Sequence, residues 1–158
     1  MSGFRRGVRL GIDVGRARIG VARCDPDGLL AVPVETVPRD DMSIGRIAEL
    51  VAEHDPLELV VGLPINMRGE DTASTADARE FAAGLLAATR RPVRLVDERL
   101  STVSAHQALR SSGRTQKGSR GIVDQVAAVV LLQQAVDTEK SVGFPTGTLL
   151  TLDEETTR

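Results

Sequence analysis

The spacing of the apolar residues changes near residue 40, and this change restricts the fold more than any other feature of the sequence. Before it, apolar residues alternate with other residues in three segments, as they do in half-buried strands. The segments are Val8–Val14, Arg18–Cys24 and Leu29–Val37, and turn residues at Gly15–Ala17 and Asp25–Gly28 separate them. Strands joined by such short turns pair antiparallel. The sequence therefore opens with a predicted three-stranded meander.

After residue 40, segments with helical spacing alternate with short apolar strands. The predicted helices are Ser43–Glu53, Thr72–Thr89 (capped by Thr72 or Ser74), Ser101–Ser111 and Ile122–Thr138, and the predicted strands are Leu57–Gly62 and Pro92–Asp97. Such alternation indicates parallel strands joined by helical crossovers. We therefore predict an α/β domain over residues 1–138, with a mixed five-stranded sheet flanked by helices. Residues 139–158, which carry Gly, Pro and an acidic run, are predicted to form a flexible tail.

Composition excludes some classes of protein. The chain has 158 residues, three Phe, no Trp and no Tyr, which argues against a module that stacks single-stranded bases on aromatic rings. The formal net charge is −2, so nucleic-acid binding would need a local basic patch. No stretch of 18 apolar residues and no apolar leader segment is present, and we expect a soluble cytoplasmic protein without a membrane partner.

Three carboxylates stand at unusual places in the predicted elements. Asp13 lies inside an apolar strand, Glu98 directly follows another, and Asp124 shares a helix face with small and apolar residues. Each has an ordinary alternative when taken alone: Asp13 can cap a turn, Glu98 can pair with its neighbour Arg99, and Asp124 can stabilise a helix N-terminus. Taken together, they would gather at one edge of the sheet.

Gathered carboxylates repel one another unless cations neutralise them. Hard divalent cations prefer oxygen ligands, and Mg²⁺ bound by few carboxylates keeps positions open for phosphate oxygens. The three acids therefore predict a Mg²⁺ or Mn²⁺ site of the kind that hydrolyses phosphodiesters. Whether it holds one or two ions stays open.

A basic stretch without any Asp or Glu runs from Arg99 to Val123. Its cations are candidates for contacts with a nucleic-acid backbone, although a solvated loop has the same composition. They are Arg99, Arg110, Arg114, Lys117 and Arg120. The single cysteine, Cys24, excludes an intrachain disulfide and leaves two alternatives, a buried strand residue or an intermolecular bridge in a homodimer.

Four motifs in order resemble the YqgF family, also called RuvX, over about Val8 to Val136. They are Gly11–Gly15 with Ile19–Ala22, Val60–Gly69, Val96–Thr102 and Val123–Leu132. The resemblance implies a ribonuclease-H-like fold and a metal-dependent nuclease. The family's acids fall on Asp13, Glu98 and Asp124, and its active-site loops on Gly15, Asn66 and Gly69.

The resemblance implies cleavage of the 5′ end of pre-16S ribosomal RNA, resolution of four-way DNA junctions, or both. Symmetric cutting of a junction would favour a homodimer. Two other functions stay open on the sequence alone. A protein with the same fold could bind nucleic acid or a ribosome precursor without cutting it, and the Asp-x-Gly hairpin also occurs in actin-like ATPases, which need two such domains.

Overall fold

The computed structural model describes residues 3–98 and 120–150 of the chain. Its described elements comprise six strands and three helices. In chain order they are β1 (Arg9–Val14), β2 (Arg18–Cys24), β3 (Ala31–Pro38), α1 (Ser43–His54), β4 (Glu58–Leu63), α2 (Ala73–Thr89), β5 (Val93–Asp97), α4 (Arg120–Val142) and β6 (Thr148–Leu150). The helix predicted at Ser101–Ser111 and the cations from Arg99 to Lys117 lie outside the described residues.

The strands form one mixed sheet in the order β3-β2-β1-β4-β5-β6. β1, β2 and β3 pair antiparallel, whereas β1, β4 and β5 run parallel, with Ile12 opposite Val61 and Val61 opposite Leu95. The carboxyl ends of β1, β4 and β5 therefore meet at one edge of the sheet. This is the mixed α/β architecture that the sequence predicts.

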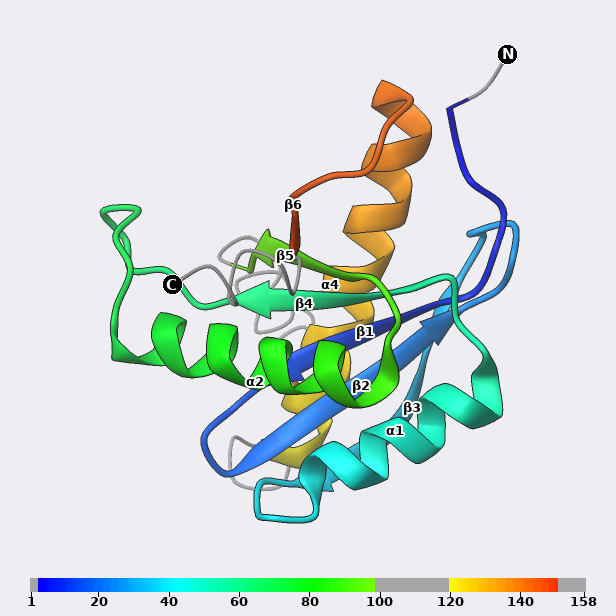
Figure 1. Ribbon diagram of the computed structural model, residues 1–158. Coiled ribbons are helices and arrows are strands. Elements are labelled where there is room, and N and C mark those ends of the chain that lie inside the picture. The colour runs from blue at the N-terminus through cyan, green and yellow to red at the C-terminus, as the bar shows by residue number, and fades with distance from the viewer. Residues whose placement is uncertain (1–2, 99–119, 151–158) are drawn as a thin grey trace.

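Helices cover both faces of the sheet, so the fold has three layers (Figure 1). α1 and α2 lie on one face and α4 crosses the other. Two apolar clusters fill the spaces between the layers: one joins α1 and α2 to the sheet, and the other joins α4 to it. Alternation along β1 explains this division, because Leu10, Ile12 and Val14 belong to the first cluster while Gly11 faces α4.

Local chemistry fixes the turns and helix ends between these elements. Gly15 N donates to Arg18 O at 2.9 Å and closes the β1–β2 hairpin. The Asp25 carboxylate accepts from the backbone nitrogens of Asp27, Leu29 and Leu30, so it holds the turn before β3. Thr72, one of the two predicted caps, forms a reciprocal capping box with Thr75 at the start of α2.

The sequence expectation is wrong for the end of the domain. α4 continues past Thr138 to Val142, and Thr148–Leu150 pairs with β5 as a sixth strand. Residues 139–150 are therefore part of the fold rather than of a flexible tail, whereas 151–158 lie outside the described residues. The last turn of α4 is held because Glu139, only 2 % exposed, binds arginines near the N-terminus.

Glu139 belongs to a network of charged side chains at the edge of the sheet opposite the carboxyl ends of β1, β4 and β5. Arg5 donates to both Glu58 and Glu139, at 2.9 and 2.8 Å. Arg9, itself 1 % exposed, donates to Glu139 at 3.1 Å, and Arg94 donates to Glu58 at 3.2 Å. Burial alone would raise the pKa of Glu139, but the hydrogen bonds from Arg5 and the charge of Arg9 hold that pKa below its ordinary value.

The structure decides between the two alternatives for Cys24. Its side chain is 1 % exposed in β2, inside the cluster beneath α4, and burial raises the pKa of the thiol. A buried thiol of this kind is unreactive. An intermolecular bridge through Cys24 is therefore incompatible with the folded chain.

Candidate active site

Asp13 and Glu98 meet at the carboxyl ends of β1 and β5. Asp13 is the fifth residue of β1 and Glu98 directly follows β5, whose end is tied to β4 by the Glu98 N–Leu63 O hydrogen bond of 3.2 Å. Strand alternation points both side chains to the face that α4 covers, the same face as Gly11 and Val96. Their side chains are joined by a hydrogen bond. The structure thus brings together two of the three predicted acids.

The environment of Glu98 disfavours its charged form. Burial, the charge of Asp13, the hydrogen bond that protonated Glu98 donates to Asp13 and the charge of Asp97 together raise the pKa of Glu98 to about 9. Its Oε2 atom is buried and has no hydrogen-bond partner among the described residues. A buried oxygen without a partner is costly, and within the described residues no basic side chain is paired with it.

The third acid, Asp124, lies in the first turns of α4, and its side chain is outside the described part of the structure. The residues that share a helix face with Asp124 are described from one turn later in α4. Ala127, Ala128 and Leu131 on that face are all buried against the sheet, at 4 %, 0 % and 2 % exposure. The sequence argument that this face turns inward is correct for these three residues.

Two glycines allow α4 and the acids to come close to the sheet. A Cβ on Gly11 would lie 2.8 Å from Leu132 Cβ and 3.0 Å from Ala128 O, so α4 packs directly on the backbone of β1. A Cβ on Gly62 would lie 2.8 Å from Glu98 Oε2 and 3.1 Å from Glu98 Cβ. Sequence reasoning placed Gly62 in a motif but did not find that Glu98 occupies its side-chain space.

The predicted loop residues lie in two turns, one directly after β1 and one directly after β4. Arg39 donates to Gly15 O at 2.9 Å and binds Asp77 through its two terminal guanidinium nitrogens, so the turn after Asp13 is connected to α2. That guanidinium holds the pKa of Asp77 below its ordinary value. Asn66 and Gly69 form a tight turn after β4, with Gly69 at φ +79° and its N–H donating to Asn66 O.

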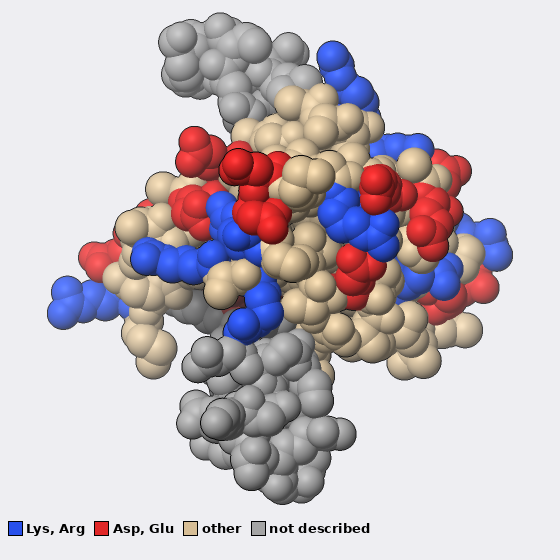
Figure 2. Space-filling view, turned by 90° about the horizontal axis from the view of Figure 1, so that it is seen from below, with Lys and Arg blue, Asp and Glu red and all other residues tan. Residues whose placement is uncertain are grey.

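The structure adds an exposed cation that the sequence analysis did not single out. Arg16, in the turn after β1, lies 3.4 Å from Ser74 Oγ and lines a hollow of about 390 Å³ with Arg39 and Asp77. Its only sequence signal is its place two residues after the end of an acid-bearing strand. Figure 2 shows that Lys and Arg are interspersed with Asp and Glu on the face seen there, so that face carries no uniform positive charge.

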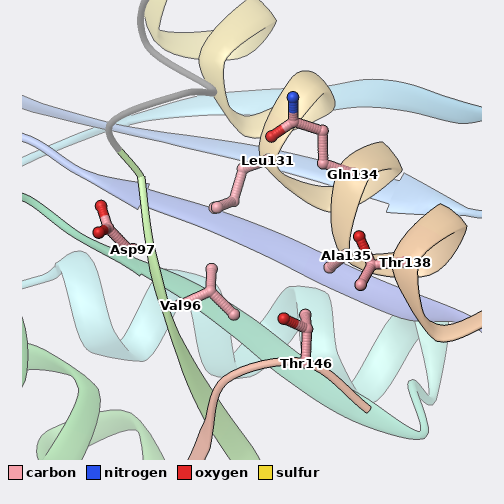
Figure 3. A pocket seen from close by; sticks show the side chains of 7 residues that line it. All are labelled: Val96, Asp97, Leu131, Gln134, Ala135, Thr138 and Thr146. Atoms are coloured by element: carbon pink, nitrogen blue, oxygen red, sulfur yellow. The ribbon is translucent and has the colours of Figure 1, made fainter. Parts of the chain in front are cut away.

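A small cavity of about 100 Å³ lies nearby, between α4, the end of β5 and the segment before β6. Figure 3 shows Val96 and Leu131 pointing toward each other across it, with Thr138 and Thr146 at its other end. The described residues that line it include one carboxylate, Asp97, and no basic side chain. The described lining of this cavity therefore does not resemble a phosphate site.

No group of three or more His, Cys, Asp or Glu side chains that could hold a metal occurs within residues 3–98 and 120–150, insofar as their side chains are described. The predicted set has three acids, of which the structure describes two. The donor chemistry nevertheless fits a hard cation: two converging carboxylates, one buried oxygen without a partner, and a glycine that leaves room for them. No helix in the described part of the chain is long and apolar enough to cross a membrane.

Comparison with known proteins identifies the family. A family model described as "RuvX: Holliday junction resolvase" matches residues 7–138, which is most of the chain. This chain belongs to the RuvX family. The resemblance stated from the four sequence motifs is confirmed, and the family name agrees with the predicted nuclease function.

Curated RuvX relatives match over nearly the whole length. A protein of Clavibacter sepedonicus is 57 % identical over 150 residues, which cover 93 % of each chain. One of Streptomyces coelicolor is 52 % identical over 147 residues, covering 91 % of this chain and 88 % of the relative. Both carry the name "Putative pre-16S rRNA nuclease".

Among solved structures, RuvC of Thermus thermophilus in complex with a Holliday junction substrate matches with a TM-score of 0.56. The match covers 90 % of this chain and 99 % of RuvC, at 18 % identity. At that identity the likeness concerns the fold alone. It confirms the predicted ribonuclease-H-like α/β class, with six strands in place of the predicted five.

Proposed function

We propose that this RuvX protein is a divalent-metal-dependent endonuclease that hydrolyses phosphodiester bonds in structured nucleic acid. The observation that carries the proposal is the contact between Asp13 and Glu98 at the carboxyl ends of parallel strands, with a buried Glu98 oxygen left unpaired. Strand ends in α/β sheets are where ligands bind. A purely structural acid pair at this place would be difficult to explain, because it destabilises the fold.

Asp13, Glu98 and Asp124 would hold Mg²⁺ or Mn²⁺. When bound, such an ion polarises a phosphate oxygen and lowers the pKa of attacking water. The chain's own residues prepare the site: Gly62 keeps space for Glu98, and the Gly11 contact sets α4, the helix that carries Asp124, close to β1. Without a cation, Glu98 holds a proton that it would lose when the ion binds.

We assign the contacts with the substrate backbone to basic side chains near the carboxyl ends of β1, β4 and β5. Arg16 is exposed beside the turn after β1 and can contact a phosphate without breaking a strong ion pair. Arg99, Arg110, Arg114, Lys117 and Arg120 remain proposed backbone contacts on the ground of sequence, since their side chains lie outside the described part. Arginine suits such contacts because its guanidinium binds phosphate in a bidentate manner.

The names of the curated relatives favour a ribosomal RNA precursor as substrate, and the family description favours a four-way DNA junction. Both substrates present the same phosphodiester to the same acids. A junction would in addition favour a homodimer, because two strands must be cut symmetrically.

One experiment tests the activity and separates the substrates. The full chain is incubated with a 5′-extended 16S RNA fragment and with a four-way DNA junction, each with Mg²⁺, Mn²⁺ or EDTA. We expect cleavage that needs the metal and falls at least about 100-fold in Asp13→Asn and Asp124→Asn, but not in the surface control Asp27→Asn. Normal cleavage by both site variants would refute the assignment. Tight binding without cleavage under every metal condition would instead favour the non-catalytic binding factor.

A further inference from the structure

The segment between β4 and α2 is built as a short, internally bonded projection, which we call the finger (residues 64–71). Asn66 N donates to Glu70 O at 3.1 Å, and an isolated antiparallel bridge joins Ile65 to Asp71. The Asn66 side chain accepts from the backbone nitrogens of Arg68 and Glu70, both at 2.9 Å. Every one of these bonds closes within the finger, so its shape does not depend on a partner.

The base of the finger is fixed to α2 and to the backbone of Glu98. Thr75, buried in the first turn of α2, donates its hydroxyl hydrogen bond to Pro64 O. The preceding residue, Leu63, accepts from Glu98 N. The finger is therefore held in a fixed relation to Glu98, and Figure 1 shows the segment between β4 and α2 standing away from the three layers.

The tip of the finger exposes one apolar side chain, Met67, beside the exposed Arg68. Met67 is 94 % exposed, the highest value among the exposed large hydrophobic side chains of the described residues. A single exposed apolar residue is ordinary on a protein surface. This one differs because a rigid turn presents it to solvent on the side of the molecule where cleavage is proposed, and nothing in the finger packs on it.

We propose that Met67 is a specificity-determining wedge that inserts between neighbouring bases of a structured nucleic acid near the bond to be cut. The inference rests on the proposed nuclease function. Met67 lies four residue steps after Leu63, so the tip reaches at most about 14 Å beyond the sheet edge. That distance corresponds to about four base steps of 3.4 Å.

The chemistry of a wedge suits an unbranched apolar side chain. Proteins that kink nucleic acid insert Phe, Leu, Ile, Met or Pro between base steps, at a cost of a few kcal/mol for unstacking. That cost is smallest where stacking is already interrupted, as at a branch point or the end of a helix. Met67 would therefore favour branched or terminated duplexes over continuous ones.

The test measures base unstacking by fluorescence and measures cleavage in a separate assay. The cleavage-deficient Asp13→Asn chain is bound to a four-way DNA junction and to a helix–single-strand boundary carrying 2-aminopurine at successive positions. We expect increased fluorescence at one or two positions within about four nucleotides of the cut. The increase in fluorescence should disappear when Met67→Ser is added to the Asp13→Asn chain, and it should persist when Met67→Leu is added instead. Met42→Ser, which alters another exposed methionine (75 % exposed) just before α1, is the matched control.

In the chain with an intact site, Met67→Ser should lower the preference for branched over continuous duplex at least about tenfold. Unchanged fluorescence and unchanged preference in Met67→Ser would overturn the wedge, even where the chain cuts normally. A chain that never cuts but shows the Met67-dependent fluorescence would refute the nuclease and still support the wedge.

Discussion

The Glu98 carboxylate occupies the space that a side chain on Gly62 would need: its Oε2 atom lies 2.8 Å from the position of a Gly62 Cβ. Gly62 lies in β4, opposite Val96, and Glu98 directly follows the neighbouring parallel strand β5. A glycine in the middle of a buried strand weakens that strand. Gly62 is explained here by the Glu98 carboxylate, which fills the space that a larger side chain would take.

Substituting Gly62 should therefore affect the site more than the fold. In Gly62→Ala, the new methyl group would displace Glu98 and lower cleavage at least about tenfold, with a matching loss of Mg²⁺ affinity measured by calorimetry. Gly45→Ala is the control, because a Cβ there has nothing within 4 Å and lies in helix α1. That change should raise the free energy of unfolding by about 0.5–1 kcal/mol and leave cleavage intact. Equal activity of the two variants would contradict this role of Gly62.

Glu98→Gln should stabilise the metal-free chain, and more so at higher pH. The folded chain holds the Glu98 proton up to a pKa of about 9, whereas the unfolded chain releases it near pH 4.5. Between those values the folded state binds more protons, so this group makes stability fall as pH rises. Gln cannot ionise and removes that loss. At pH 8 in EDTA we expect a gain of at least about 1 kcal/mol, or roughly 2–4 °C in Tm.

The same comparison at pH 4 provides the control for Glu98→Gln, since both side chains are then neutral and the Tm difference should nearly vanish. A gain of the same size at pH 4 and pH 8 would mean that the stabilisation does not come from the carboxylate charge.

Metal binding should release protons. Because Glu98 is protonated near neutral pH in the metal-free chain, a bound cation must displace that proton. Titration of Mg²⁺ or Mn²⁺ at pH 7.5 in two buffers of different ionisation enthalpy should show release of up to about one proton, and the apparent affinity should rise with pH. Glu98→Gln should release far fewer protons. Proton-neutral binding by the unaltered chain would place the ion elsewhere.

Glu139→Ala should destabilise the fold without touching the candidate site. It leaves Arg9, 1 % exposed, with its charge unpaired at the opposite edge of the sheet. Breaking a buried ion pair from one side costs about 3–5 kcal/mol, measurable by urea unfolding. Glu53→Ala, which removes a largely exposed carboxylate near His54, should cost less than about 0.5 kcal/mol. Similar losses in both variants would contradict a structural role for the network.

The features that sequence predicted well are those that nearby residues determine. The hairpin at Gly15, the cap at Thr72 and the buried face of Ala127 and Ala128 all follow from spacing over a few positions. Asp13 and Glu98 were found because an acid interrupts or ends an apolar strand, which is also a local pattern.

The features that were missed depend on residues far apart in the chain. Glu139 looks like the start of a polar tail until its partners Arg5 and Arg9 are known, 134 and 130 positions earlier. β6 has three residues, none of them buried. It forms because it pairs with the edge of β5, where Val93 is opposite Leu150. The role of Gly62 could not be predicted, since it depends on how deeply Glu98 is set against the neighbouring strand.

The pairing of Arg9 with Glu139 also bears on how the protein is made. β1 is a central strand, yet the carboxylate that binds its buried arginine and the side chains that pack on Gly11 belong to α4, near the end of the described chain. Ribosomes add about 5–20 residues per second, so the 130 positions between the two residues correspond to roughly 7–26 seconds. During that interval the nascent chain has neither the helix that covers this face of the sheet nor the carboxylate that binds Arg9.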